Sequence, residues 1–234
     1  MTAILPPGPR GPLISIEGIS GAGKTYLTRR LVRDPAITAT EAFSERARAG
    51  AGAIGDQILR AMIAAAHGEH FLRGGYPGTE TVLLLAVKTS DFEHHLPLLA
   101  RGQAVIEGRG LDSTAVYQSL ITSPGDLDRA HAEARAILAI AAQWRPLPDL
   151  TILITDDVTT AIERAEQRDH RRFTAEQMSI HHQAARLFSL LATDYPDRYQ
   201  TIDRRATSMR QAQAHCAEWI TGLRYRLASG TAAR

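Results

Sequence analysis

The chain alternates short apolar runs with longer amphipathic segments. Runs at 13–16, 36–43, 103–107, 149–155 and 198–203 are apolar or rich in β-branched residues and have the length of strands, the second ending near Glu41. The segments between them place apolar residues at helical spacing and predict helices at 24–32, 54–66, 79–102 with an interruption near Pro97, 111–120 with Asp112 or Ser113 as cap, 126–144, 161–173, 175–193 and 207–227. Strands that alternate with helices predict an α/β fold, with a mostly parallel sheet covered by helices on both faces.

The length of the chain fits one domain. With 234 residues, of which 44% are hydrophobic, the chain can bury a full core. We expect a flexible, proline-rich lead-in at 1–12, one domain at 13–228 and a short tail at 229–234. Ligands of parallel sheets bind at the carboxyl ends of the strands, which points to a site rimmed by Gly18, Glu41, Glu107 and Thr155.

The first strand runs directly into a glycine-rich turn. Residues 18–25 read GISGAGKT and match the G-x-x-x-x-G-K-[ST] pattern of a phosphate-binding P-loop. Its three glycines let the backbone take positive φ and turn several N–H groups toward one anion. We therefore expect Lys24 on the β- and γ-phosphates of a nucleotide and Thr25 on Mg²⁺. The expected phosphate-binding residues are Gly18, Ser20, Gly21, Ala22, Gly23, Lys24 and Thr25.

Composition narrows the classes of partner. The formal net charge of +2 is too small to indicate a nucleic-acid polymer. The single cysteine, Cys216, excludes an internal disulfide and fits a reducing compartment, where a small buried helix residue is its expected role. No apolar run approaches the length of a membrane span, and the first residues lack the features of a signal peptide. We expect a cytoplasmic protein that acts without a membrane.

Four stretches resemble the thymidylate kinase family. Residues 14–27, ISIEGISGAGKTYL, are similar to the opening of thymidylate kinases and of deoxynucleoside kinases. Residues 79–119, 163–173 and 190–203 resemble the long helix with its following Asp-Arg-Tyr segment, the arginine-bearing lid and the closing strand of thymidylate kinases. The resemblance implies a P-loop kinase three-layer sandwich with a five-stranded sheet, a lid at about 164–174, ATP with Mg²⁺ and a small-molecule nucleotide or nucleoside substrate. It also implies a homodimer, for which the helix from Thr81 is a candidate interface.

The departures from the family pattern all fall on the acceptor side. Gly108-Arg109-Gly110 stands where the family has Asp-Arg-Tyr, and Thr40-Glu41-Ala42-Phe43 stands where it has Arg-Glu-Pro-Gly. Val87-Lys88 stands where an arginine preceded by aspartate is expected. We therefore expect phosphoryl transfer to persist with a non-standard acceptor, such as a modified nucleoside or nucleotide.

Charged residues near the strand ends receive the following roles. Arg109 is placed to grip the acceptor's phosphate, because a guanidinium offers two parallel donors to two oxygens. Glu107 is expected to organise Mg²⁺ through water or to orient the acceptor. For Asp112, helix capping competes with a bond to a sugar hydroxyl or to Arg109. For Lys88, an acceptor contact competes with an ordinary solvated position.

Aromatic and lid residues complete the expected site. The resemblance implies that Tyr117 and Gln118 hold a base, and Phe43 and Tyr76 are further candidates, although each aromatic also suits a core. Four arginines lie in the lid-like segment, and we expect Arg168 and Arg172 to approach the γ-phosphate, because acidic residues there are too few to neutralise them all. The pairs His94-His95 and His181-His182 lack ligand spacing for a metal and are expected to be structural.

Three functions remain open from the sequence. The first is a kinase that transfers the γ-phosphate of ATP to a nucleoside monophosphate, thymidylate-like or related. The second is a nucleoside or small-molecule hydroxyl kinase of the same fold, in which Glu41 acts as general base. The third is a nucleotide-dependent switch ATPase without an acceptor, suggested by the missing aspartate at position 108.

Overall fold

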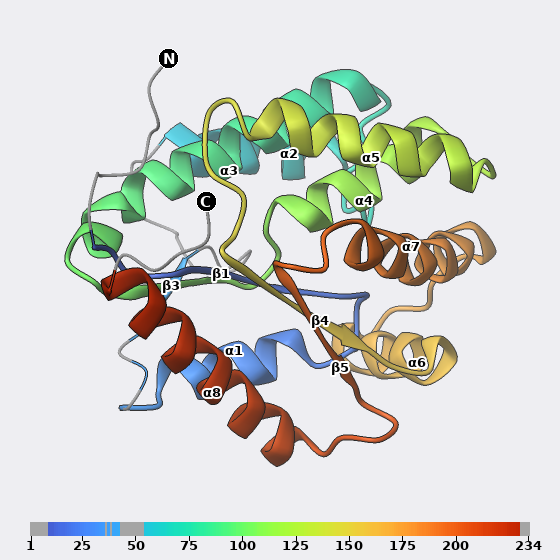
Figure 1. Ribbon diagram of the computed structural model, residues 1–234. Coiled ribbons are helices and arrows are strands. Elements are labelled where there is room, and N and C mark those ends of the chain that lie inside the picture. The colour runs from blue at the N-terminus through green and yellow to red at the C-terminus, as the bar shows by residue number, and fades with distance from the viewer. Residues whose placement is uncertain (1–8, 36, 38, 43–53, 230–234) are drawn as a thin grey trace.

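One parallel sheet organises the molecule (Figure 1). The computed structural model describes residues 9–35, 37, 39–42 and 54–229. In this part the sheet has five strands in the order β2-β3-β1-β4-β5, and every neighbouring pair is parallel. The strands are β1 (Leu13–Glu17), β2 (Ala39–Ala42), β3 (Ala104–Glu107), β4 (Leu150–Thr155) and β5 (Tyr199–Asp203). The predicted α/β class with a parallel sheet is confirmed.

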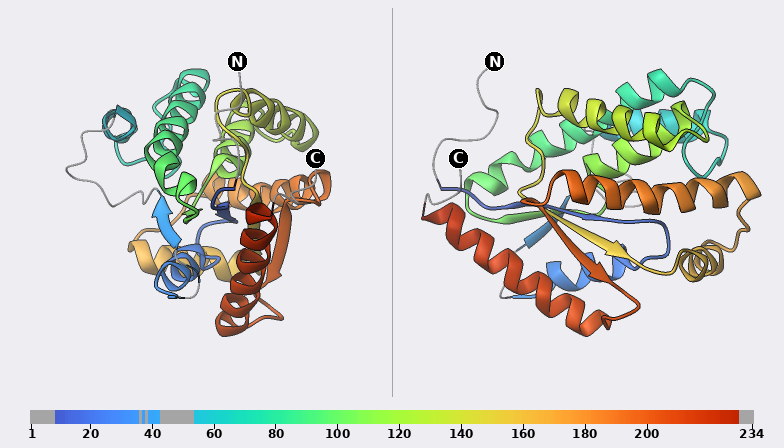
Figure 2. Two further views of the ribbon diagram at one scale, coloured as in Figure 1. Left: turned by 60° about the vertical axis from the view of Figure 1, so that its left-hand side comes forward. Right: turned by 45° about the vertical axis from the view of Figure 1, so that its right-hand side comes forward.

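Helices cover both faces of the sheet (Figures 1 and 2). Helices α1 (Lys24–Val32) and α8 (Met209–Ala228) lie on one face. The other face carries α2 (Ile54–Ala65), α3 (Pro77–Ala100), α4 (Leu111–Thr122), α5 (Leu127–Ala141) and α7 (Ala175–Asp194). Helix α6 (Val158–Asp169) lies beyond the carboxyl end of β4. All strand residues of β1 and β3 are buried, so the middle of the sheet forms the floor of the core.

The interruption of the helix that was predicted near Pro97 is wrong. Pro97 lies inside α3, which continues to Ala100. Proline removes one backbone hydrogen bond, and here the loss falls in the last turn of the helix. Leu99, fully buried beside Leu13 and Phe92, keeps that turn packed against the sheet. Burial of the last turn outweighs the missing bond.

The last residues of the expected lead-in contact the domain, whereas residues 1–8 lie outside the described part. The guanidinium of Arg10 donates two hydrogen bonds of 2.7 Å to the carboxylate of Asp149. The amide of Gly11 donates to the carbonyl of Leu99 at 2.8 Å, and a Cβ on Gly11 would come within 1.8 Å of the Gln103 carbonyl oxygen. Arg10 and Gly11 thus pack against the domain, and the expected bounds of the domain stay a prediction.

Candidate active site

The turn between β1 and α1 has the geometry expected of a phosphate cradle. Gly18, Gly21 and Gly23 all have positive φ, of 129°, 80° and 106°, as their pattern predicted. A Cβ on Gly21 would lie 1.8 Å from a backbone oxygen of α6, and one on Gly18 would lie 2.3 Å from the carbonyl oxygen of Ile154. Only glycine fits at these two positions, and α1 begins at Lys24 with its N-terminus toward the turn. The residues therefore fit a nucleotide's phosphate chain.

Four cations, which we call the P-loop cations, contact successive residues of this turn. Lys24 Nζ donates to the carbonyls of Gly18 and Ile19 at 2.6 and 2.7 Å. Three arginines from other elements contact the next three residues. Arg109 donates to Ser20 Oγ at 3.0 Å, Arg164 to the Gly21 carbonyl at 3.4 Å and Arg204 to the Ala22 carbonyl at 3.1 Å. The fold thus gathers four positive groups around one anion cradle.

Arg109 reaches the P-loop from the carboxyl end of β3. Its backbone has φ 143°, which is unfavourable for a residue with a Cβ. Lys88 of α3 donates a short hydrogen bond from Nζ to the carbonyl oxygen of Arg109, and Lys88 is 4% exposed. The solvated position considered for Lys88 is therefore wrong. The phosphate-gripping role of Arg109 and an acceptor contact of Lys88 stay predictions.

Glu107 has a different environment from the one expected for a metal-organising carboxylate. Arg145 donates to both of its oxygens, at 2.7 and 3.1 Å, and both side chains are almost fully buried. The same guanidinium donates to the Lys88 carbonyl at 3.0 Å and lies 5.0 Å from the centre of the Phe92 ring. Both oxygens of Glu107 thus accept from Arg145, while its expected role in organising Mg²⁺ or orienting the acceptor stays a prediction.

Asp112 is neither a helix cap nor a partner of Arg109 in this structure. Gly110 is the N-cap of α4, and Asp112 is fully buried. Its carboxylate accepts from the two terminal nitrogens of Arg198, at 2.6 and 3.0 Å, and from the Tyr199 hydroxyl at 2.7 Å. It therefore ties α4 to the start of β5, where the guanidinium of Arg198 also packs over the ring of Tyr195.

Glu17, the last residue of β1, holds the segment that follows β3. One of its oxygens accepts from the amide of Gly110 at 2.6 Å and from Ser15 Oγ at 2.5 Å, and the other accepts from the Ser113 hydroxyl. Burial raises the pKa of Glu17, and the negative charge of Asp112 raises it further. Sequence reasoning missed Glu17, although its place at a strand end beside the P-loop was a usable signal.

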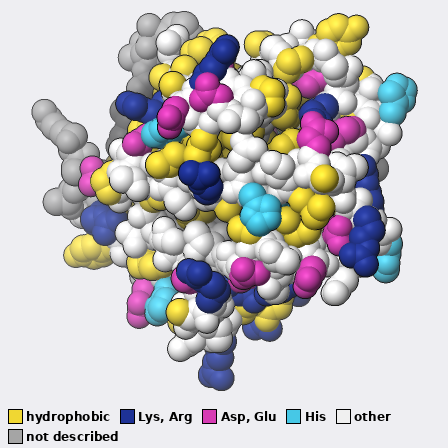
Figure 3. Space-filling model, turned by 90° about the vertical axis from the view of Figure 1, so that its right-hand side faces the viewer, with side chains coloured by type: hydrophobic (Ala, Val, Ile, Leu, Met, Phe, Trp, Pro, Cys, Tyr) yellow, Lys and Arg dark blue, Asp and Glu magenta, His cyan; other side chains and the backbone are white. Residues whose placement is uncertain are grey.

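The arginines of the lid-like segment contact different partners. Three of its four arginines have acidic partners: Arg164 pairs with Asp156 at 2.5 Å, Arg168 with Asp169 at 2.7 Å and Arg172 with Glu166 at 2.8 Å. Arg171 donates to the Gly68 carbonyl. Acidic and basic side chains are accordingly interspersed on the side of the molecule that Figure 3 shows. Arg164, which lies on α6 one turn before Arg168, contacts the P-loop. The approach of Arg168 and Arg172 to the γ-phosphate stays a prediction.

Aromatic and histidine rings from four segments form a cluster. The segments are the loop after α2, helix α4, the end of the lid-like segment and helix α7. Phe71 stacks on Tyr117 with ring centres 5.3 Å apart, and His181 lies 5.0 Å from Phe173 and 5.6 Å from His70. Burial, then His70 and Arg109, lower the pKa of His181 to about 3. Burial and Arg109 lower the pKa of His70 to about 4. These neutral histidines are thus part of the same electrostatic environment as the P-loop cations.

The expected base-holding residues are only partly placed. Tyr117 and Gln118 are buried on α4, and Gln118 accepts a hydrogen bond from Thr81 at 3.0 Å. Tyr76 is 73% exposed at the start of α3. Phe43 lies outside the described residues, and the structure gives only the backbone of Glu41, which pairs with Ile106. Base binding by Tyr117 and Gln118 and base catalysis by Glu41 stay predictions.

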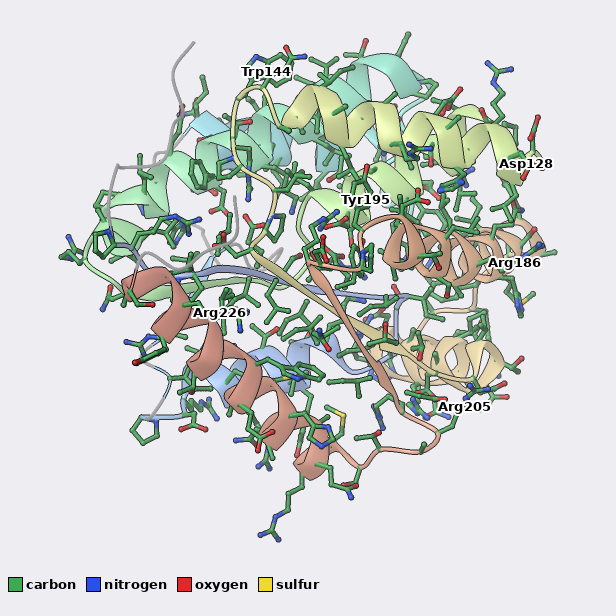
Figure 4. The ribbon with its side chains drawn as sticks, in the orientation of Figure 1. Asp128, Trp144, Arg186, Tyr195, Arg205 and Arg226 are labelled. Carbon is green, nitrogen blue, oxygen red and sulfur yellow. The ribbon has the colours of Figure 1, made fainter. Side chains whose placement is uncertain are left out.

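Besides Arg164, the sequence analysis left one further P-loop cation unselected, Arg204. It directly follows β5, at the same edge of the sheet as Gly18 and Thr155, so the rule that ligands bind at strand ends could have found it. Its neighbour Arg205 lies beside α6 where β5 ends and pairs with Asp203 instead (Figure 4). A cavity of about 520 Å³ opens at this edge, with Gly18, Ile19 and Thr155 in its lining.

Comparison with known proteins decides the family. The family model for thymidylate kinase matches residues 16–214. The chain belongs to the thymidylate kinase family. A thymidylate kinase of Jannaschia sp. (strain CCS1) is 32% identical over 223 residues, which cover 90% of this chain and 96% of that protein. A thymidylate kinase of Chlamydia felis (strain Fe/C-56) is 29% identical over 194 residues, covering 82% and 89%.

Solved thymidylate kinases share the fold. The structure from Candida albicans superposes with a TM-score of 0.64 at 18% identity and covers 91% of this chain and 92% of that one. The structure from Ehrlichia chaffeensis has a TM-score of 0.60 at 19% identity, covering 92% and 99%. Family membership confirms that this chain is a phosphotransferase of the nucleotide kinase type. Within the described ranges, no helix has the length and apolar character needed to span a membrane.

Proposed function

We propose that this chain transfers the γ-phosphate of Mg-ATP to a nucleoside monophosphate, with thymidine monophosphate as the first acceptor to test. The observation that carries the proposal is the contact between Arg109 and Ser20. It brings a guanidinium from the end of β3 onto the loop that suits the donor's phosphates. A cation in that position can bind an acceptor phosphate while staying next to the phosphoryl group that is transferred.

The chain's own residues supply positioning and charge. The P-loop amides and Lys24 bind the phosphates of the donor, and Arg109 binds the acceptor. Thr25, exposed in the first turn of α1, would help to hold Mg²⁺, which would neutralise negative charge on the phosphates. Arg164 and Arg204 stabilise negative charge from the sides of the loop. A monophosphate acceptor is already anionic, so this proposal needs no general base.

Release of ADP from Mg-ATP in the presence of an acceptor panel tests the proposal. The panel contains deoxynucleoside monophosphates, ribonucleoside monophosphates and free nucleosides, with Lys24→Ala as the inactive control. We expect a signal that requires a monophosphate and is lost in Lys24→Ala, and a strongly raised acceptor KM in Arg109→Ala. Stimulation by free nucleosides alone, lost in Glu41→Gln, would establish the hydroxyl kinase instead.

Slow ADP release that no acceptor stimulates, unchanged in Arg109→Ala, would establish the switch ATPase. Residues 108–110 differ from the Asp-Arg-Tyr segment of the family, so the identity of the acceptor is the most informative result of the panel. A cytoplasmic location, a homodimer and the lack of a polymeric partner stay predictions.

A further inference from the structure

Lys88 is a buried cation in the middle of α3. It is 4% exposed, and burying an ammonium group is costly unless hydrogen bonds compensate for the lost water. Its Nζ donates to the carbonyl oxygen of Arg109, 21 residues further along the chain. Its own carbonyl accepts from Arg145, the partner of Glu107. Lys88 thus connects the buried ion pair of Glu107 and Arg145 to the backbone of Arg109, the residue that reaches the P-loop.

The segment that Lys88 contacts has little rigidity of its own. Arg109 stands between two glycines, which allow many backbone conformations, and its own φ of 143° is one that a residue with a side chain rarely adopts. Free in solution, a Gly-Arg-Gly segment would therefore populate other conformations. Something in the fold must hold this one.

Among the described residues, contacts lie on both sides of the peptide bond between Arg109 and Gly110. The carbonyl of Arg109 accepts from Lys88, and the next amide, that of Gly110, donates to Glu17 at 2.6 Å. Gly110 itself is packed so closely that a Cβ would lie 2.5 Å from Ser15 Oγ. With this peptide plane held by a cation on one side and a carboxylate on the other, the Arg109 side chain is directed to Ser20.

We propose that Lys88 is a positioning residue: its ammonium group holds the Arg109 peptide in the strained conformation that places the guanidinium on the P-loop. The inference rests on the proposed function, because Arg109 is taken there as the acceptor's phosphate clamp. It assigns to Lys88 an action through Arg109 rather than a contact with the acceptor. A residue that acts only through another has a specific thermodynamic signature, because its loss has no effect once the other is gone.

A double-mutant cycle measures that signature. Lys88→Met removes the donor at similar size, Arg109→Ala removes the clamp, and the affinity for thymidine monophosphate is measured by calorimetry for both single variants and the double variant. We expect Lys88→Met to weaken the acceptor's Kd by about tenfold, the scale of one charge-assisted hydrogen bond, and the ATP Kd to change less than about twofold. In the Arg109→Ala background, Lys88→Met should change nothing further. Lys88→Arg, which keeps a charged donor, should recover part of the affinity.

Hydrogen exchange of a peptide spanning 104–118 provides a readout that needs no substrate. We expect faster exchange in Lys88→Met and no change in Thr89→Val, the neighbouring control on α3. Additive losses in the cycle would show a direct contact between Lys88 and the acceptor and would overturn the positioning role, as would unchanged exchange. If the unmutated chain binds no monophosphate, the proposed function fails, and that result is distinct from either of these.

Discussion

Replacing Asp112 by asparagine separates a structural role from the substrate-binding role that its position suggests. The carboxylate is fully buried and accepts from Arg198 through two hydrogen bonds and from the Tyr199 hydroxyl. Asparagine keeps the shape and one acceptor oxygen but removes the negative charge. The guanidinium of Arg198, whose side chain is 12% exposed, would then remain buried without its counter-ion.

The size of the effect follows from this burial. Breaking a buried ion pair by removing one partner costs about 3 to 5 kcal/mol, because the remaining charge is uncompensated. For a domain of this size, each kcal/mol lowers the Tm by about 2 to 4 °C, so we expect a decrease of about 6 to 20 °C. The relief of repulsion on Glu17, which Asp112 now exerts, offsets a small part of this cost.

Urea unfolding at pH 7 and the acceptor's KM provide the two measurements. Asp112→Asn should lower the midpoint of unfolding strongly and, at a temperature where the variant is folded, leave the acceptor's KM nearly unchanged. Asp128→Asn, an exposed control in the first turn of α5, should change stability by less than about 0.5 kcal/mol (Figure 4). Replacing both partners, by Asp112→Leu with Arg198→Met, should recover much of the lost stability. A tenfold rise in KM without loss of stability would refute the structural role.

Three further predictions concern the P-loop, α7 and the lid. Gly21→Ala should abolish ATP binding in calorimetry, because its Cβ would lie 1.8 Å from a backbone oxygen, whereas Gly78→Ala, with open space around it, should bind normally. In the folded chain the pKa of His181 is lowered to about 3. Below pH about 6.5 this side chain therefore takes up a proton in the unfolded chain but not in the folded one, which favours unfolding. Stability to urea should fall toward pH 5, and less steeply in His181→Gln. Glu166→Gln should speed hydrogen exchange at 170–174 without changing the Tm, since Glu166 accepts from the Phe173 amide at 2.7 Å; unchanged exchange would contradict this.

The features confirmed from the sequence alone are local ones. The P-loop turn, its positive-φ glycines and the bounds of α1 follow from residues adjacent in the chain, and the layered fold follows from the alternation of strands and helices. The contacts that the sequence did not predict join residues distant in the chain. Glu107 pairs with Arg145, 38 residues away, and Asp112 with Arg198, 86 residues away. A pattern shows that a carboxylate stands near a strand end, but only packing decides whether a cation already occupies it.

Arg145 and Arg198 differ from Arg109 and Arg204 in the oxygens that they contact, whereas Arg164 contacts both a P-loop carbonyl and the carboxylate of Asp156. Arg145 and Arg198 lie in the core and donate to carboxylates, so their charges are compensated within the protein. At the P-loop, Lys24, Arg109 and Arg204 each donate to at least one neutral carbonyl or hydroxyl oxygen. Hydrogen bonds to ionised oxygens are roughly twice as strong as those to neutral ones, so a phosphate that reaches this loop is favoured over the present partners. The buried ion pairs also favour anion binding. Arg145 compensates the charge of Glu107, and Arg198 compensates that of Asp112. Without these partners, the two carboxylates would weaken the attraction of the P-loop cations for phosphate.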